Sequence, residues 1–522
     1  MKEEPITQQS SSNASLDSSN ELSLLEEEEN DYVELNEANF MDDAFGIGQL
    51  TETLTKNQER PPGEELNESS TEKTNYEDAP TQRRKSTAAE VVQKYKFWDK
   101  EFKNERTKII LRFIYNYIYL IAGLCIALCI YWGSYYNRTS RFKRMKMGIY
   151  IADQPVGVLP NIVGKTIEYF FTNVTAIQAA GDFQVWNYEK LDEAAKSHNN
   201  NITEEVYRQI HHQKVWLGFY VRENATLQWY QALATGQNFN ISTSLMELVY
   251  ETGRDYNAVN NYIITVYQQI LRGYYTFIPQ SNLVGSMLNT LNETQVNNIM
   301  NNAPELVTTI PTFKVVDLLP VQNPVFQAPL QIGLIYLVIF AFFQFIFTIK
   351  IHMYIAEKIK GLPYVGYRIL SAQFAYLIVS LAFVTLNTAF GLDFTRTFGY
   401  SGFLVIWMFG YLTMASLGSI IELLVLLLFV IKPQLIGFLL LFVAVTNLAP
   451  TVSPIVLCPD FYRYGYAMPV RNAYDLLHVA YFDAWKGHMG RNIGVLITWI
   501  VVSNAVMPFV MKWMAKKKAQ RK

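Results

Sequence analysis

Six stretches of the chain are apolar over nearly their whole length. A membrane helix needs about 20 mostly apolar residues, because the hydrocarbon core is about 30 Å thick and each helical residue rises about 1.5 Å. By this criterion the predicted spans cover residues 109–132, 330–349, 364–390, 401–431, 435–452 and 493–513. The pattern therefore predicts an α-helical polytopic membrane protein with about six spans, five of them within residues 330–513.

The region between the first two spans, residues 133–329, has a different pattern. Short apolar runs at residues 147–153 and 214–221 are typical of strands. Stretches with helical periodicity accompany them, at residues 203–212, 226–234 and 256–272. The sequence therefore predicts an α/β extracytoplasmic domain in this region. It holds no cysteine, so no disulfide can stabilise it.

Charge is unevenly distributed near the N-terminus. Residues 1–80 carry 21 acidic and 4 basic side chains, whereas residues 81–112 carry 10 basic and 4 acidic ones. The first segment is also rich in Ser, Thr and Asn, and it cannot bury enough apolar surface to offset the entropy of an ordered chain. We expect residues 1–87 to form a disordered acidic cytosolic tail, with no signal peptide before it.

The basic segment at residues 88–108 precedes the first predicted span, residues 109–132. Val91, Tyr95, Trp98 and Phe102 recur at helical spacing with lysines between them, which favours an interfacial helix on the cytosolic leaflet. A solvated basic flank of the span is the equally weighted alternative. Ser86 follows two arginines and a lysine, so it is a phosphorylation candidate that would place about −2 of charge beside this basic patch.

The orientation follows from charge and from glycosylation motifs. An even number of spans puts both termini on one side, and the basic tail at residues 514–522 places that side in the cytosol. Asn-x-Ser/Thr triplets cluster in residues 133–329 and are absent after residue 330. The six glycosylation candidates are Asn137, Asn173, Asn201, Asn224, Asn240 and Asn292, of which Asn137 lies close to the membrane.

Glu422 is a carboxylate within the fourth predicted span, where a charged side chain costs about 2.5–3.5 kcal/mol on insertion scales. Arg368, near the cytosolic end of the third span, is a partner within reach. The two membrane polar candidates form either a structural ion pair or a polar site on a substrate or proton path. Small residues on the fourth span permit close helix packing, within the chain or in a homodimer: Gly410, Ala415, Gly418 and Ser419.

Motifs of catalysis or cofactor binding are missing. The chain has no HExxH, GxSxG or Walker A sequence. His211 and His212 lack the further ligands that a metal requires, so we expect a surface pair. Arg254 and Asp255 are expected to form a structural bridge. We predict a protein that is not an enzyme, has no cofactor or metal and binds no nucleic acid.

Three passages carry a family resemblance. They are WLGFYVRENAT from Trp216 with YETGRD from Tyr250, DLLPVQNPVFQAPLQIGLIYLVIFAFFQF from Asp317, and CPDFYRYGYAMPVRNAYDLLHVAYF from Cys458. In these passages the chain resembles the fungal nitrosoguanidine-resistance membrane proteins over residues 145–510. Their layout is similar to that of bacterial phage-infection-protein-like exporters and ABC-type export permeases. The resemblance implies no catalytic residues. By analogy with the ABC-type permeases, the segment from Cys458 to Gly490 is expected to cap the bundle as a partly re-entrant helix, with anchoring at the membrane interface as the alternative.

By this resemblance the protein is expected to be a permease-like exporter that confers resistance to small toxic compounds. A non-transporting scaffold or regulator, for example of lipid distribution between leaflets, is the alternative, because few charges in the spans suit both functions. The expected partners are membrane lipids and a small amphipathic substrate. The expected location is a membrane of the secretory pathway, the plasma membrane ahead of the endoplasmic reticulum.

Overall fold

The computed structural model describes residues 97–359 and 361–521. The acidic tail and Ser86 lie outside this part of the chain. The described residues belong to two compact units, one with residues up to 119 together with 431–437, the other with residues 120–430 and 438–522. The second unit holds both the sheet and most of the long helices.

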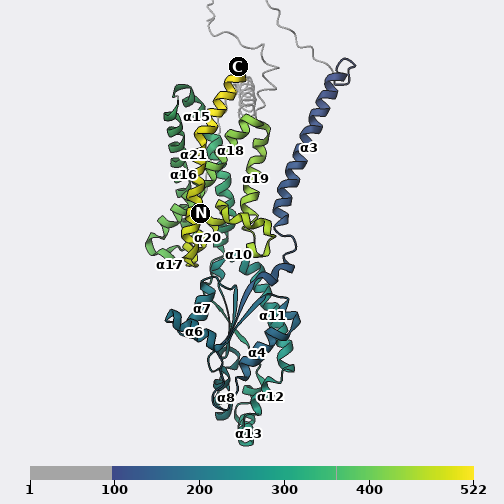
Figure 1. The fold of residues 1–522 in the computed structure, drawn as a ribbon, viewed down its shortest axis with the longest axis vertical. Helices are drawn as coiled ribbons and strands as arrows, with labels where there is room; N and C mark the ends of the chain where they lie inside the picture. The colour runs from purple at the N-terminus through teal and green to yellow at the C-terminus, as the bar shows by residue number, and fades with distance from the viewer. Residues whose placement is uncertain (1–96, 360, 522) are drawn as a thin grey trace, which may run out of the picture. The chain divides into compact units, whose positions relative to one another are not determined.

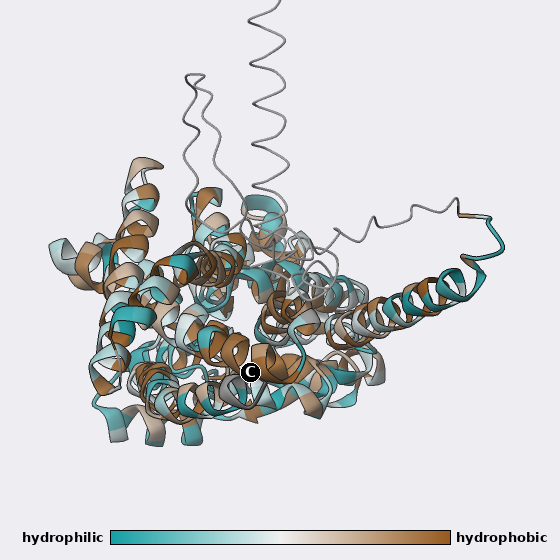
Figure 2. Ribbon diagram, turned by 90° about the horizontal axis from the view of Figure 1, so that it is seen from above, coloured by the Kyte–Doolittle hydropathy of each residue, from teal (hydrophilic) through white to brown (hydrophobic). Residues whose placement is uncertain are grey.

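In the described residues, five helical stretches are long and apolar enough to cross a membrane. They are Lys103–Gly133, Pro324–Lys358, Leu362–Ala389, Thr395–Ile431 and Lys486–Lys517. Many of their large apolar side chains point outward, for example Phe347, Leu370 and Phe374, each more than 60% exposed. Figure 2, coloured by hydropathy, shows many brown, hydrophobic residues along the helices. Outward apolar surface of this kind is suited to lipid, so the chain is a multi-pass membrane protein.

The fifth predicted span, residues 435–452, is shorter than the sequence suggested. It forms α19, Ile436–Leu448, which has 13 residues and is therefore about 20 Å long. Pro450 lies two residues beyond the helix end, and the residue before a proline disfavours helical geometry. The apolar run of the predicted span therefore extends beyond the end of the helix at Leu448.

The long stretches consist of several elements. Pro324–Lys358 contains the 3₁₀ turn η5 (Pro324–Phe326), the short π-helix η6 (Ala328–Gly333) and α15 (Leu334–Lys358). The other main elements are α3 (Lys103–Gly133), α16 (Leu362–Ala389), α17 (Thr395–Phe398), α18 (Gly402–Ile431) and α21 (Met489–Arg521). We call α15, α16, α18 and α21 the bundle.

The predicted interfacial segment, residues 88–108, is described from residue 97, and its last six residues belong to α3. Residues 97–102 are turns, and α3 begins at Lys103. Arg106 lies over the ring of Trp98 and donates a hydrogen bond to the carbonyl of Phe97. Trp98 and Phe102 therefore precede the helix, as in the alternative of a basic flank.

Residues 146–317 form a five-stranded sheet with helices on both faces, which we call the sheet domain (Figure 1). The strand order is β2-β1-β3-β4-β5, and only the β3–β4 pair is antiparallel. The strands are β1 (Lys146–Ile151), β2 (Asp182–Trp186), β3 (Leu217–Val221), β4 (Met246–Tyr250) and β5 (Phe313–Asp317). The strands expected at residues 147–153 and 214–221 are thus confirmed as β1 and β3.

The central strand β1 shows why the sheet is covered on both sides. Met147, Ile149 and Ile151 point into one apolar core, whereas Tyr150 points into a second core on the opposite face. Side chains alternate along a strand, and a strand buried on both faces needs apolar residues at every position. The run MGIYI meets this requirement.

The helices of the sheet domain divide between the two faces. Figure 1 shows α6 and α7 on one side and α4 and α11 on the other. The expected helices at residues 203–212, 226–234 and 256–272 are confirmed. The main helices are α4 (Ile162–Asn173), α6 (Tyr188–His198), α7 (Ile202–His211), α8 (Ala225–Thr235), α10 (Tyr256–Ala258), α11 (Ile264–Phe277), α12 (Leu283–Leu288) and α13 (Glu293–Asn302).

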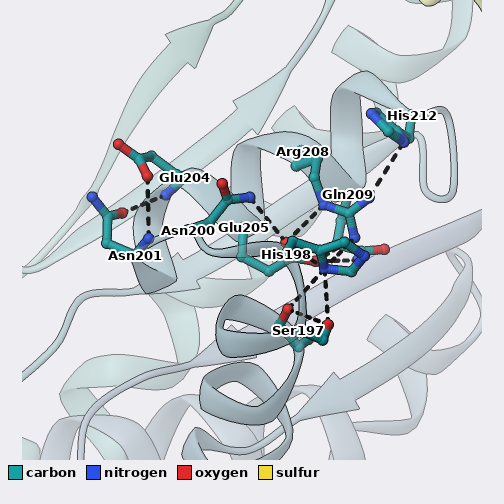
Figure 3. A network of polar contacts seen from close by, with 10 residues as sticks. Ser197, His198, Asn200, Asn201, Glu204, Glu205, Arg208, Gln209 and His212 are labelled. Carbon is teal, nitrogen blue, oxygen red and sulfur yellow. Dashed lines mark hydrogen bonds and ion pairs between the residues drawn. The ribbon is translucent and has the colours of Figure 1, made fainter.

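A polar network fixes the connection between α6 and α7 (Figure 3). The buried Glu205 carboxylate accepts hydrogen bonds from Arg208 at 2.7 Å and from Gln209 at 2.6 Å. Arg208 donates two of these bonds, and Asn200 donates a fourth at 3.3 Å. Because the charge is neutralised by partners from its own helix and the preceding turn, this cluster is structural.

Candidate functional site

Arg368 and Glu422 pair inside the bundle, as their positions in the sequence suggested. Arg368 Nε on α16 donates to Glu422 Oε1 on α18 at 2.5 Å. The two residues are only 4% and 2% exposed. Removing one partner from such a buried pair leaves an uncompensated charge, so the two side chains depend on one another.

Further polar groups surround this pair. Arg368 donates to the hydroxyl of Tyr364 at 3.4 Å, and that hydroxyl donates to the carbonyl of His352 on α15 at 3.1 Å. Tyr376, fully buried on α16, packs against Gly418 of α18. We call His352, Tyr364, Arg368, Tyr376 and Glu422 the bundle cluster.

The bundle cluster is not fully satisfied. Within the described part of the chain, three of its buried atoms have no hydrogen-bond partner: Arg368 Nη2, Tyr376 Oη and His352 Nδ1. A buried polar atom without a partner costs about 1–3 kcal/mol. Three such atoms beside an ion pair leave donor and acceptor capacity for a water, a proton or a ligand.

A second polar region lies where the sheet domain meets the bundle. Its main element is α20 (Pro469–Phe482), almost wholly buried and outside the candidate spans. It packs against α21, α17 and α15 on one side and against the 3₁₀ turn η2 (Thr252–Arg254) of the sheet domain on the other. This packing agrees with the expected capping role.

Asp255 and Arg254 take separate partners, so the expected bridge between them is wrong. Asp255 caps α10 by accepting from the Ala258 amide at 3.0 Å, and it accepts from the Tyr474 hydroxyl of α20 at 2.6 Å. Arg254 donates to the carbonyl of Val215 at 2.6 Å and lies over the ring of Trp216. The backbone turns sharply between them, which separates adjacent residues.

His478 of α20 fastens the helix to the sheet domain. Its Nδ1 donates to the Tyr474 carbonyl at 2.8 Å, and its Nε2 accepts from the Tyr256 amide at 3.3 Å. Both bonds together require the neutral ring. Burial lowers the pKa of His478 below its usual value of 6.5, which favours the same form.

A cavity of about 410 Å³ opens at this junction. Its wall is drawn from the sheet domain, the loop after α19, α20 and the start of α21. Its charged side chains are Lys214, Arg254, Arg471 and Arg491 against Asp255 and Asp475. Apolar and aromatic groups complete it, including Trp216, Ile455, Val479 and Trp485. We call this space the junction cavity.

The cations of the junction cavity are unequally compensated. Arg471 lies 3.0 Å from Asp475 and 3.7 Å from Asp255. Burial alone would lower the pKa of Arg471, but these two carboxylates raise it above the usual value. Arg254 has weaker compensation, and burial lowers its pKa to about 10. The cavity thus contains four cations and two carboxylates, and both carboxylates lie within 4 Å of Arg471.

The two adjacent histidines do not form a simple surface pair. His211 Nδ1 lies 3.0 Å from Glu251, which raises the pKa of His211 by hydrogen bonding. His212 stacks on Trp485 with the ring centroids 5.5 Å apart. In the described residues, no group of three or more metal-ligating side chains comes together.

The glycosylation candidates all lie on or beside the sheet domain. Five are exposed, and Asn224 is half-buried with a left-handed backbone. Two of them cap helices with their side chains: Asn201 caps α7 and Asn292 caps α13, each by accepting a hydrogen bond from the third residue of its helix. Such a cap uses the side-chain oxygen. The amide nitrogen, where a glycan attaches, remains outside the cap.

Sequence reasoning found the Arg368–Glu422 pair and missed the junction cavity. A charged residue in an apolar run is visible locally. The cavity instead combines residues 214–216, 254–255 and 471–492, which are far apart in the chain. The only local signal was the mixture of charged and aromatic residues in the segment after Cys458.

Comparisons with known proteins place the chain among membrane proteins. Residues 116–505 match a family model described as a protein of unknown function, DUF3533. The chain is 30% identical over 436 residues to the uncharacterized endoplasmic reticulum membrane protein YJR015W of Saccharomyces cerevisiae. The alignment covers 81% of this chain and 84% of the yeast protein. No solved structure matches. Because the family model covers most of the chain, including the sheet domain and the bundle, this protein belongs to the DUF3533 family.

Proposed function

We propose that this protein is a permease-like exporter of small amphipathic compounds. The observation that carries the proposal is the bundle cluster, which combines an ion pair with three buried atoms that have no partner among the described residues. Ionisable residues within membrane helices are rare and usually belong to substrate or proton paths. A purely structural pair gains most when all its hydrogen bonds are made, so the unused capacity favours a path.

In this proposal Glu422 is the group that changes state. When ionised, it pairs with Arg368. When protonated, it releases Arg368 to interact with a passing substrate. Tyr364 and Tyr376 supply hydroxyls on either side of the arginine along α16, one and two helical turns away. A proton gradient could then drive export without an ATPase motif in the chain.

We also propose the orientation in which both termini are cytosolic and the sheet domain is lumenal or extracellular. Exposed sequons on the sheet domain and the basic C-terminal tail support it. The yeast relative is named as an endoplasmic reticulum protein, which supports that membrane over the plasma membrane for this chain too.

The test is rhodamine efflux from vesicles that contain only the purified protein, with and without a proton gradient. We expect efflux above the empty-vesicle rate for the unmodified chain and for Glu357→Gln, a matched change at an exposed position of α15. Glu422→Gln is expected to reduce efflux per reconstituted molecule to the empty-vesicle rate, whereas the unpaired Arg368 lowers only the amount of protein recovered.

Two results would contradict the proposal. Efflux by the unmodified chain that never exceeds that of empty vesicles would favour the alternative of a membrane scaffold. If Glu422→Gln lowers abundance and a second change, Arg368→Gln, restores both abundance and efflux, the pair is structural, because neutralising both partners removes the unpaired charge.

A further inference from the structure

We infer that the junction cavity is a binding site for the phosphate group of an amphipathic molecule. This site is separate from the bundle cluster, and the inference does not depend on transport. Three observations lead to it: the excess of cations, the level of the cavity along the spans, and the division of its wall into charged and apolar parts.

The first observation is charge. Among the described residues, Lys214, Arg254 and Arg491 form no ion pair with a carboxylate, whereas both carboxylates of the cavity lie within 4 Å of Arg471. Glu251 and Asp255 act on Arg254 only at longer range. Lys214 and Arg491 are exposed at the rim, one from the sheet domain and one from the start of α21. Arg491 is held by Asn492 at 3.2 Å and lies over the ring of Tyr466. An anion placed between them would supply the missing negative charge.

The second observation is position along the chain. The candidate span formed by residues 486–517 begins in the cavity wall, at His488, Met489 and Arg491. The start of a span lies at the level of the lipid head groups. Trp485 lies one residue before this span, where tryptophan is typical of the membrane interface. The cavity is therefore at the level of phosphate groups.

The third observation is the wall itself. Trp216 and Trp485 line the cavity, with Arg254 over one face of Trp216 and His212 stacked on Trp485, and Ile455, Val456 and Val479 add an aliphatic side. The remaining wall is polar and contains the four cations and two carboxylates. Such a division fits a ligand with an anionic head and an apolar body better than it fits a fully hydrated ion. Phosphate suits this site because its oxygens can accept from several guanidinium and ammonium groups at once.

The experiment measures calorimetric binding to the purified full chain in non-ionic detergent. The probes are short-chain phosphatidic acid, short-chain phosphatidylcholine and inorganic phosphate. We expect saturable binding of phosphatidic acid that weakens as ionic strength rises. The double variant Lys214→Gln with Arg491→Gln is expected to weaken it about tenfold or more, since each removed cation loses a charge-assisted hydrogen bond.

The matched control is Lys165→Gln with Lys314→Gln, which removes two exposed cations of the sheet domain away from the cavity. It is expected to bind as the unmodified chain does. Tighter binding of phosphatidic acid than of inorganic phosphate identifies a lipid-like ligand, and equal binding identifies free phosphate as the source of the same group.

The inference is overturned if neither phosphatidic acid nor inorganic phosphate binds. It is also overturned if the control variant weakens binding as much as the cavity variant does. It is also overturned if phosphatidylcholine binds as tightly as phosphatidic acid and the cavity variant leaves both unchanged. Glu422→Gln is expected to keep full binding, so a failure of the export proposal would leave this result intact.

Discussion

At Gly418 the backbone of α18 approaches α16 so closely that a side chain has no room. A Cβ built there would lie 2.2 Å from Tyr376 Cζ and 2.3 Å from its hydroxyl. The close-packing role expected from Gly410, Ala415, Gly418 and Ser419 is therefore confirmed within the chain at this position. The absent side chain allows the Tyr376 ring to lie next to the Arg368–Glu422 pair.

We predict that Gly418→Ala destabilises the bundle. The tyrosine ring would have to move, and overpacking of this kind costs about 1–3 kcal/mol. The measurement is the thermal unfolding midpoint in detergent. Gly494→Ala is the control, because nothing lies within 4 Å of the added Cβ and alanine favours a helix by up to about 1 kcal/mol. Equal midpoints for the two variants would contradict the packing argument.

Helix α20 joins the sheet domain to the bundle. It is fastened to the sheet domain by Tyr474 on Asp255 and by His478 on the Tyr256 amide. Gly253 brings η2 close to it, since a Cβ there would lie 2.6 Å from Phe482 Cβ. The contacts alternate between polar and apolar, and they fix both the position and the rotation of α20.

We predict that this junction loses stability as the pH falls below about 6.5. Burial lowers the pKa of His478 in the folded chain, so the unfolded chain takes up the proton first and stability decreases, by at most about 1.4 kcal/mol per pH unit. His211 acts in the opposite direction, because its hydrogen bond to Glu251 raises its pKa. Its contribution is complete below 6.5 and is lost as the pH rises through its folded pKa.

His478→Gln separates these effects. Glutamine keeps an acceptor near the Tyr256 amide but does not titrate. The difference in unfolding midpoint between pH 7.5 and pH 5.5 should therefore shrink in this variant. These two values lie about one unit on either side of the usual histidine pKa. An unchanged difference would show that other groups cause the acid sensitivity.

For the whole molecule, orientation is the property on which the export proposal depends. If the sheet domain is lumenal, its exposed sequons should carry glycans, with the exception of Asn137, which lies four residues after the end of α3 at Gly133. We predict that an endoglycosidase shifts the electrophoretic mobility of the full chain by several glycans.

Single-site variants can assign these glycans. Asn201→Asp and Asn292→Asp are expected to lose one glycan each and still fold, because aspartate retains the oxygen that caps α7 and α13. Asn173→Gln and Asn240→Gln test two sites without a capping role. The N-terminal segment also holds two Asn-x-Ser triplets, at Asn13 and Asn67. A glycan on either of them, or none on the sheet domain, would contradict the orientation.

Much of the molecule could be predicted from local patterns. Apolar length located five helices long enough to cross a membrane, and alternating or helical spacing located β1, β3, α7, α8 and α11. The Arg368–Glu422 pair could be predicted too, because a charge in an apolar run needs a partner and few lie within reach. Apolar length overestimated α19, which has 13 residues and ends two residues before Pro450, within the apolar run.

By itself, then, the sequence determined which segments are apolar enough for lipid, where the sheet domain begins and that Glu422 needs a cation. Only the tertiary structure decided that Asp255 meets Arg471 and Tyr474, that Tyr376 fills the space beside Gly418 and that four cations surround one cavity. The physical reason is range. Periodicity and transfer free energy act on neighbouring residues, whereas a cavity depends on how distant segments pack.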